Sequence, residues 1–153
     1  MAGTDTAGTG TAGTSAALRA FQPVPDGLTE PFWLGAAEGR LLLSRCPRCR
    51  RWQHPPLAAC RFDGTALQPE EAPMEGVIYS YTTMYHRSVP LYDTPFVVAV
   101  VEVGAIGGPR IVVRVVDCEP DQVAVGAHVA IEIRDLPGGT FKVPVAVLEG
   151  DPQ

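Results

Sequence analysis

The sequence predicts a mainly β protein with three parts: an N-terminal helix, a small cysteine-bearing hairpin unit and a barrel of five short strands. Two observations support this fold class. Three cysteines, Cys46, Cys49 and Cys60, lie close together, and after Pro73 short β-branched and aromatic runs alternate with glycine and proline. A chain of 153 residues, 46% of them hydrophobic, is long enough to bury one modest core.

Composition divides the chain into three regions. Residues 1 to about 17 repeat Ala, Gly and Thr with almost no apolar bulk, so we expect residues 1–24 to form a disordered tail. Residues 25–73 should hold the helix and the cysteine unit, and residues 74–150 should form the barrel. The longest apolar run is too short to cross a bilayer, and we expect a cytoplasmic location.

A helix is predicted from about Thr29 to Glu38. Thr29 is a suitable N-cap, Pro31 is tolerated in the first turn, and Gly39 favours a C-terminal stop. A short strand at 41–44 should then lead into the first cysteine pair.

Five strands are predicted after Pro73, each bounded by glycine or proline. They lie near Val77–Tyr85, Pro95–Val103, Arg110–Val116, His128–Arg134 and Phe141–Leu148. Pro144 falls inside the last strand and indicates an edge or a bulge there, because proline cannot donate a ladder hydrogen bond.

The cysteine spacing predicts a zinc ribbon. Cys46 and Cys49 form a complete two-residue-spaced pair, whereas Cys60 is followed at the same spacing by Asp63 and then Gly64. A carboxylate can bind zinc, so Asp63 is the first candidate for the fourth ligand. The alternative fourth ligands are His54 and, after it, Cys118.

The same residues are also compatible with a ribbon that binds no zinc. Asp-Gly is also a common tight-turn dipeptide, and such a ribbon can keep its fold without a metal ion. A disulfide is a weaker alternative in a reducing compartment. A redox-active dithiol is weaker too, since such pairs usually begin a helix in an α/β fold.

Positive charge gathers around the cysteines although the net charge is −5. Residues 40–62 contain six arginines and no acidic residue. These arginines either cover the ribbon surface as solvated side chains or form a face that binds phosphates or carboxylates. The candidate ligand- or partner-binding residues here are Arg48, Arg50, Arg51 and Trp52.

Tyrosines mark the first barrel strand. Tyr79, Tyr81 and Tyr85 fall on one face by the period-two rule, which fits ordinary strand composition or a stacking surface. Tyr85 and the pair His86 and Arg87, at the end of this strand, are further candidates for ligand contact.

The order of these features resembles the zinc-ribbon plus OB-fold family of acyl-CoA-associated proteins, over roughly residues 28 to 148. The resemblance rests on Pro31-Phe32-Trp33, Gly39-Arg40-Leu41, Cys46-x-x-Cys49, Pro55-Pro56, Cys60-x-x-Asp63-Gly64, Pro95-Phe96-Val97-Val98 and Val125-Gly126-Ala127-His128-Val129. It implies a rubredoxin-like ribbon and a five-stranded OB-fold barrel. The chain departs from the family pattern at Arg50, where glycine is usual, and at Asp63, where a fourth cysteine is usual.

The resemblance also implies a function. Members are non-catalytic accessory subunits of thiolase-like acyl-CoA enzymes, such as thiolases or the retro-aldolases of steroid and lipid side-chain degradation, and some pair with hydratases. The ribbon and helix dock on the partner, while the barrel helps to enclose the acyl-CoA.

Two other functions compete with this one. Ribbons and OB folds also bind nucleic acids, but residues from 63 onward carry thirteen acids against five bases. An independent enzyme using the cysteines as nucleophiles lacks any supporting motif in the sequence.

Overall fold

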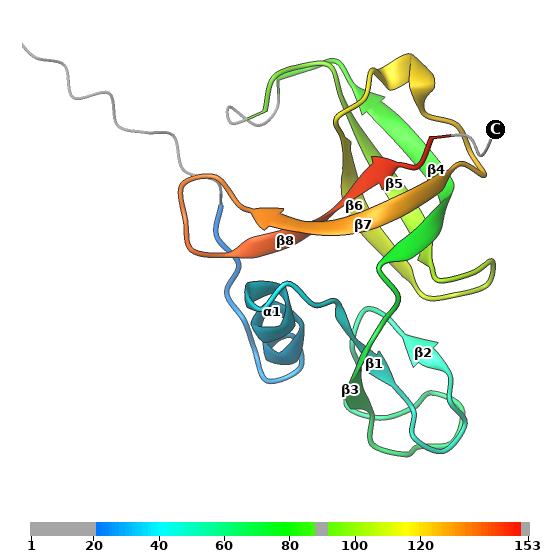
Figure 1. Cartoon of the computed structure of the whole chain (residues 1–153). Helices are drawn as coiled ribbons and strands as arrows, with labels where there is room; N and C mark the ends of the chain where they lie inside the picture. The colour runs from blue at the N-terminus through cyan, green and yellow to red at the C-terminus, as the bar shows by residue number, and fades with distance from the viewer. Residues whose placement is uncertain (1–20, 88–91, 151–153) are drawn as a thin grey trace, which may run out of the picture.

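The computed structural model describes residues 21–87 and 92–150. Most of the expected disordered tail, residues 1–24, lies outside the described residues. One helix and a three-stranded sheet precede a five-stranded barrel (Figure 1). The elements are α1 (Glu30–Ala37), β1 (Leu42–Arg45), β2 (Trp52–Gln53), β3 (Gln68–Glu71), β4 (Glu75–Met84), β5 (Phe96–Val103), β6 (Arg110–Val116), the 3-10 turn η1 (Pro120–Gln122), β7 (His128–Asp135) and β8 (Lys142–Leu148).

The barrel confirms the predicted fold class. Its strands follow the order β4-β5-β6-β8-β7, and β7 pairs with β4 to close it. All pairings are antiparallel except that of β6 with β8. Alternate residues of β5 point inward, so Val97, Ala99 and Val101 are 2%, 1% and 0% exposed.

The five predicted barrel strands occur within two residues of their expected bounds, whereas β2 and β3 were not predicted. β2 is only two residues long, and β3 has the sequence Gln-Pro-Glu-Glu. Neither has the β-branched alternation typical of strands. Both form by pairing with β1: β2 through the hairpin that contains the first cysteine pair, and β3 through a long-range contact that local sequence does not encode.

Pro144 lies where the barrel tolerates it. β8 pairs with β7 along its whole length, but its pairing with β6 begins only at Val145. Pro144 therefore has a neighbouring strand on one side only, which is the local edge that the sequence predicted.

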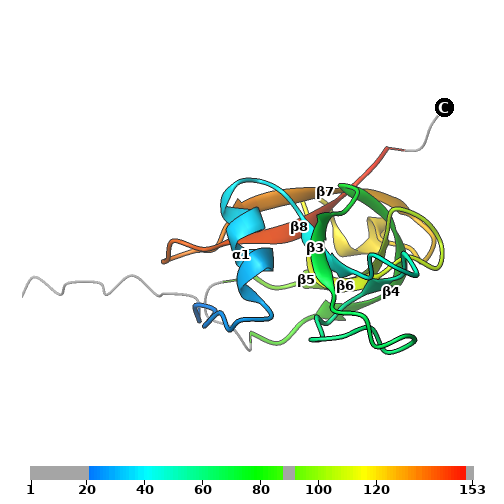
Figure 2. The same ribbon diagram turned by 90° about the horizontal axis from the view of Figure 1, so that it is seen from below.

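The ribbon and the barrel share one hydrophobic core. Leu41 and Leu43, beside and within β1, are 1% and 2% exposed and belong to the same buried cluster as the barrel valines. Ala72 joins this cluster, and its N–H donates to the carbonyl of Leu41 at 2.8 Å. Figure 2, seen from the ribbon side, shows β3 in front of the barrel.

Helix α1 connects the two parts. It contacts both β1 and β8, and Figure 2 shows it beside β8. The ring of Trp33 meets Phe141 edge-on at 5.5 Å, while the Phe32 ring lies 6.2 Å from His54 in the ribbon. A Cβ on Gly35 would lie 2.5 Å from Leu42 Cγ, so glycine permits the close approach of the helix to β1.

The expected helix bounds and the N-cap position of Thr29 are confirmed, but the Thr29 side chain does not make a capping hydrogen bond. Thr29 occupies the N-cap position without a side-chain hydrogen bond to the helix. Instead, Asp26 Oδ1 accepts from the backbone N–H groups of Leu28 and Thr29 at 3.0 and 2.8 Å. Asp26 thus organises the turn before the helix, and its hydrogen bonds with Thr29 lower its pKa.

No helix within the described ranges has the length and apolar character needed to cross a membrane.

The close pairing of β4 predicts a strong effect of substitution at Gly76. A Cβ there would lie 2.5 Å from the Glu102 carbonyl oxygen and 2.6 Å from Val101 Cγ1. Gly76→Ala is expected to lower the free energy of unfolding by about 2 kcal/mol or more, because the backbone must shift. Urea denaturation followed by circular dichroism measures this loss. Gly27→Ala is the matched control, since no atom lies within 4 Å of its added Cβ; equal effects at both positions would contradict the packing.

Candidate functional site

Two similar turns hold the cysteines. In the first, the carbonyl of Cys46 accepts from Arg50 N–H at 3.0 Å, and the N–H of Cys49 points to Cys46 Sγ at 3.4 Å. In the second, the carbonyl of Cys60 accepts from Gly64 N–H at 2.8 Å. Arg50 and Gly64 occupy equivalent positions with φ of 60° and 71°. Arg50 thus adopts the left-handed conformation that glycine usually provides at this position.

The turns bring four candidate ligands together. One ligand atom from each of Cys46, Cys49, Cys60 and Asp63 lies within 4.8 Å of all the others. Cys49 Sγ lies 3.6 Å from Cys60 Sγ, and Cys46 Sγ lies 3.5 Å from Asp63 Oδ2. Ligand atoms around a tetrahedral zinc ion with Zn–S bonds of about 2.3 Å are roughly 3.7 Å apart, so this donor set fits zinc.

A backbone hydrogen bond orients the Asp63 carboxylate and favours its ionised form. The backbone N–H of Thr65 donates to Asp63 Oδ1 at 3.0 Å and is the main reason that the pKa of Asp63 falls to about 2. The carboxylate is therefore ionised at neutral pH, as metal binding requires.

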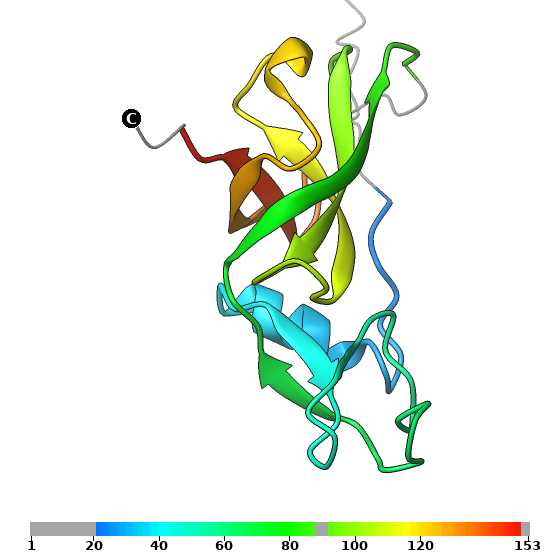
Figure 3. The ribbon, with the colours of Figure 1, turned by 90° about the vertical axis from the view of Figure 1, so that its right-hand side faces the viewer.

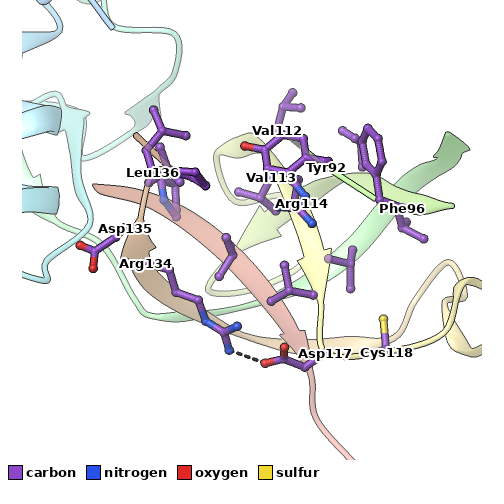
Figure 4. A pocket seen from close by; sticks show the side chains of 18 of the residues that line it. Tyr92, Phe96, Val112, Val113, Arg114, Asp117, Cys118, Arg134, Asp135 and Leu136 are labelled. Carbon is purple, nitrogen blue, oxygen red and sulfur yellow. Dashed lines mark hydrogen bonds and ion pairs between the residues drawn. The ribbon is translucent and has the colours of Figure 1, made fainter. Parts of the chain in front are cut away.

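The two alternative fourth ligands lie outside this cluster. His54 packs beside Phe32, and burial lowers its pKa. Cys118 follows β6 and lines a pocket of about 720 Å³ on the barrel, where burial raises its pKa (Figure 4). Within the described residues, the converging group contains neither side chain.

The pocket in Figure 4 is mostly apolar. Valines of β6 line it, and the Arg114 guanidinium lies 3.9 Å from the centre of the Tyr92 ring. Arg134 forms ion pairs with Asp117 and Glu132 at 2.5 and 2.8 Å, which raise the pKa of Arg134.

The arginines around the cysteines differ in their partners. Arg45 and Arg50 both pair with Glu70 Oε1, at 2.5 and 2.8 Å. Burial opposes ionisation of Glu70, but the hydrogen bonds from these two arginines lower its pKa. Arg48 is exposed at the tip of the first turn. Arg50 thus has a structural partner on β3, in addition to its expected role in binding.

A cleft of about 750 Å³ separates the ribbon from the β5–β6 hairpin. Arg50, Arg51 and Trp52 line it on the ribbon side. Arg110 lines it on the barrel side, paired with the buried Glu102 at 2.8 Å. Hydrogen bonds from Arg110 lower the pKa of Glu102.

The structure does not bring all the predicted binding residues together. Figures 1 and 3 show β4 running from the ribbon to the opposite end of the barrel. Tyr85, His86 and Arg87 are exposed just after this far end, away from the cleft. Tyr79 and Tyr81 lie outside the barrel, 48% and 41% exposed.

Sequence reasoning missed Arg110 and Gln53 as lining residues of the cleft. Arg110 is about sixty positions from Arg50 and Arg51 in the sequence, and only the packing of the ribbon on the barrel places it beside them. Gln53 had no signal beyond its position next to Trp52.

The comparisons with known proteins agree with this architecture. A rubredoxin-like zinc ribbon followed by an OB-fold domain defines the class of protein to which the chain belongs. Residues 33–67 match the model of the ChsH2 rubredoxin-like zinc ribbon domain, and residues 69–134 match that of the ChsH2 C-terminal OB-fold domain. The chain is a member of the ChsH2 family.

Two curated relatives are similar to the chain over part of their length. A probable enoyl-CoA hydratase alpha subunit of Thermomonospora curvata is 35% identical over 103 residues, covering 66% of this chain but only 32% of that protein. A DUF35 domain-containing scaffold protein of Methanothermobacter thermautotrophicus is 32% identical over 92 residues, covering 60% of this chain and 59% of its own length. The chain thus spans between a third and three fifths of these relatives.

Among solved structures, a chain of the Ltp2-ChsH2(DUF35) aldolase superposes with a TM-score of 0.76 and 28% identity, covering 83% of this chain and 98% of that one. A DUF35-family protein of unknown function from Sulfolobus solfataricus has a TM-score of 0.55 at 20% identity, covering 78% and 84% of the two chains, and shows the shared fold.

The left-handed conformation of Arg50 predicts an unusual order of stabilities. Arg50→Gly should be more stable than Arg50→Ala by about 1 kcal/mol, because both lose the pair with Glu70 but only glycine adopts this φ without strain. Urea denaturation under reducing conditions compares the two variants. At the exposed Arg48, whose φ is not positive, alanine should instead equal or exceed glycine; the same order at both positions would refute the interpretation.

Proposed function

We propose that the chain is a non-catalytic accessory subunit that docks on a thiolase-like acyl-CoA enzyme, a thiolase or a retro-aldolase, and helps to form its acyl-CoA site. The observation that carries the proposal is the similarity to a chain of the Ltp2-ChsH2(DUF35) aldolase, which extends over almost the whole of that chain. The similarity to a probable enoyl-CoA hydratase subunit is consistent with a role beside acyl-CoA chemistry. A place in steroid or lipid side-chain degradation is part of the same proposal.

Exposed apolar side chains support docking through the helix and ribbon. Leu34 on α1 is 60% exposed, and Leu57 and Phe62 in the ribbon are 45% and 51% exposed. Large apolar side chains at protein surfaces are the usual anchors of interfaces. The barrel would then face the acyl-CoA, with Tyr79, Tyr81 and the residues after β4 available for contact.

The role of the metal in this proposal is structural. We infer that Cys46, Cys49, Cys60 and Asp63 hold one zinc ion, which joins the two turns as structural zinc sites do. All four positions would be taken by protein ligands, so zinc would stabilise the ribbon that carries the docking residues. The nucleic-acid alternative is weakened by the fold, because Arg40, Arg45, Arg50, Arg110 and Arg134 are paired with carboxylates and do not form one continuous positive groove.

Zinc binding is tested by elemental analysis of protein purified without chelators, with about one zinc per chain expected. Asp63→Ala should weaken zinc binding by at least about tenfold in competition with a chelator, since it removes one ligand. Asp63→Cys should restore or tighten it, because thiolate is the softer ligand.

The matched controls are substitutions of the two side chains that were the alternative candidates for the fourth zinc ligand. His54→Ala and Cys118→Ala should leave the zinc affinity unchanged, because neither side chain belongs to the converging group. Less than a tenth of an equivalent of zinc in the wild-type chain would refute the metal assignment.

Docking is tested by affinity capture from the native host with identification by mass spectrometry. A thiolase-like acyl-CoA enzyme should be recovered in near-stoichiometric amount, and Leu34→Asp should abolish its recovery by placing a charge in the interface. Val125→Asp is the control, since Val125 is 66% exposed in the turn before β7 rather than on the helix or ribbon. Recovery without any acyl-CoA enzyme would overturn the proposal.

A further inference from the structure

The cleft between the ribbon and the β5–β6 hairpin is lined by an excess of hydrogen-bond donors. Four arginines border it, three from the ribbon and one from the barrel, where the lining comes from β5, the β5–β6 loop and the first residue of β6. The lining arginines are Arg50, Arg51, Arg61 and Arg110. Glu102 is the lining residue that carries a negative charge.

Two of the four arginines, Arg51 and Arg61, form no ion pair with a carboxylate within the described residues, so their charge can act on a ligand. Arg50 is paired with Glu70, and Arg110 with Glu102. Arg51 and Arg61 instead contact the ring of Phe62, at 4.2 and 4.9 Å from its centre. In the described part of the chain neither forms an ion pair with a carboxylate. The aromatic ring holds both cations at the cleft without neutralising them.

Gln53 provides a second and independent indication of a ligand. Its side chain lines the cleft and is only 5% exposed. Its Oε1 accepts from the backbone N–H of Arg61 at 3.2 Å, which fixes the orientation of the amide. Its Nε2 is buried and has no acceptor among the described residues. An unpaired buried donor costs stability, so such a group indicates a site for an acceptor.

We propose that this cleft binds the phosphate groups of a small organic phosphate. Arg51 and Arg61 supply charge and multiple N–H donors for phosphate oxygens, and the amide of Gln53, hydrogen-bonded to the backbone of Arg61, lies directly behind them. A volume of about 750 Å³ suits a nucleotide-sized ligand, whereas the surface of a partner protein would not reach a side chain as buried as Gln53. If the ligand is the CoA ester, which rests on the proposed function, its nucleotide phosphates occupy this cleft.

The test is CoA binding by the full 153-residue chain, measured by isothermal titration calorimetry and by NMR of the side-chain amide of Gln53. CoA should bind and shift the Gln53 amide signals, and inorganic pyrophosphate should shift the same signals. Pantetheine, which lacks the nucleotide phosphates, should not shift them. The double variant Arg51→Gln/Arg61→Gln should raise the Kd for CoA by at least about tenfold.

A charge-matched control separates the cleft from the net charge of the chain. Arg40→Gln/Lys142→Gln removes the same two charges from residues that do not line the cleft, and should change the Kd by less than about twofold. Equal weakening in both double variants, or no shift of Gln53 with CoA and pyrophosphate, would overturn the inference. Tighter binding of a single-stranded oligonucleotide than of CoA would overturn it too.

This experiment needs no partner protein, so it separates the inference from the proposed function. CoA binding that depends on Arg51 and Arg61 supports the site even if no acyl-CoA enzyme is captured. Capture of such an enzyme without CoA-dependent shifts would support the accessory role and refute the site.

Discussion

The packing of strand β1 onto the barrel is the contact on which the rest of the structure depends. Leu41 and Leu43 are buried with the barrel valines, so ribbon and barrel form a single hydrophobic core. Each part would be a very small domain by itself, with little apolar surface to bury. Their union fixes the ribbon in place relative to the β5–β6 hairpin, and only for this reason can Arg51 and Arg110 line the same cleft. Helix α1 strengthens the joint through Trp33 and Phe141.

Glu70 determines how positive charge is distributed over the ribbon. Glu70 lies on β3 and binds both Arg45, on the neighbouring strand β1, and Arg50, in the turn that follows β1. Arg51 and Arg61 have no such partner within the described ranges and lie beside Phe62. A chain with a net charge of −5 thus keeps a local region of positive charge, because the acidic residues are placed where they neutralise some arginines and not others.

Sequence patterns predicted the features that depend on residues close together in the chain, namely the barrel strands and the two cysteine turns. The barrel strands follow from alternating β-branched residues, and the two turns follow from the spacing of Cys46, Cys49, Cys60 and Asp63. The bounds of the helix and its N-cap position were predicted, although Asp26 rather than the Thr29 side chain makes the hydrogen bonds there. Strand β3 and the cleft could not be predicted, since they arise from contacts between residues distant in sequence, and β2 is too short to show a pattern. Tyr85 and Arg50 were grouped by chemistry, yet the direction of β4 separates them.

The closed barrel affects how other chains can associate with this one. Because β7 pairs with β4, the main unpaired strand edges in the described ranges belong to β2 and β3 of the ribbon. β2 has only two residues, and β3 carries Pro69, which lacks an N–H, together with two glutamates. Short, charged or proline-containing edges resist the addition of a foreign strand. Association through backbone ladders, the route that leads to fibres and swapped strands, is therefore suppressed, and side chains are left to select the partner.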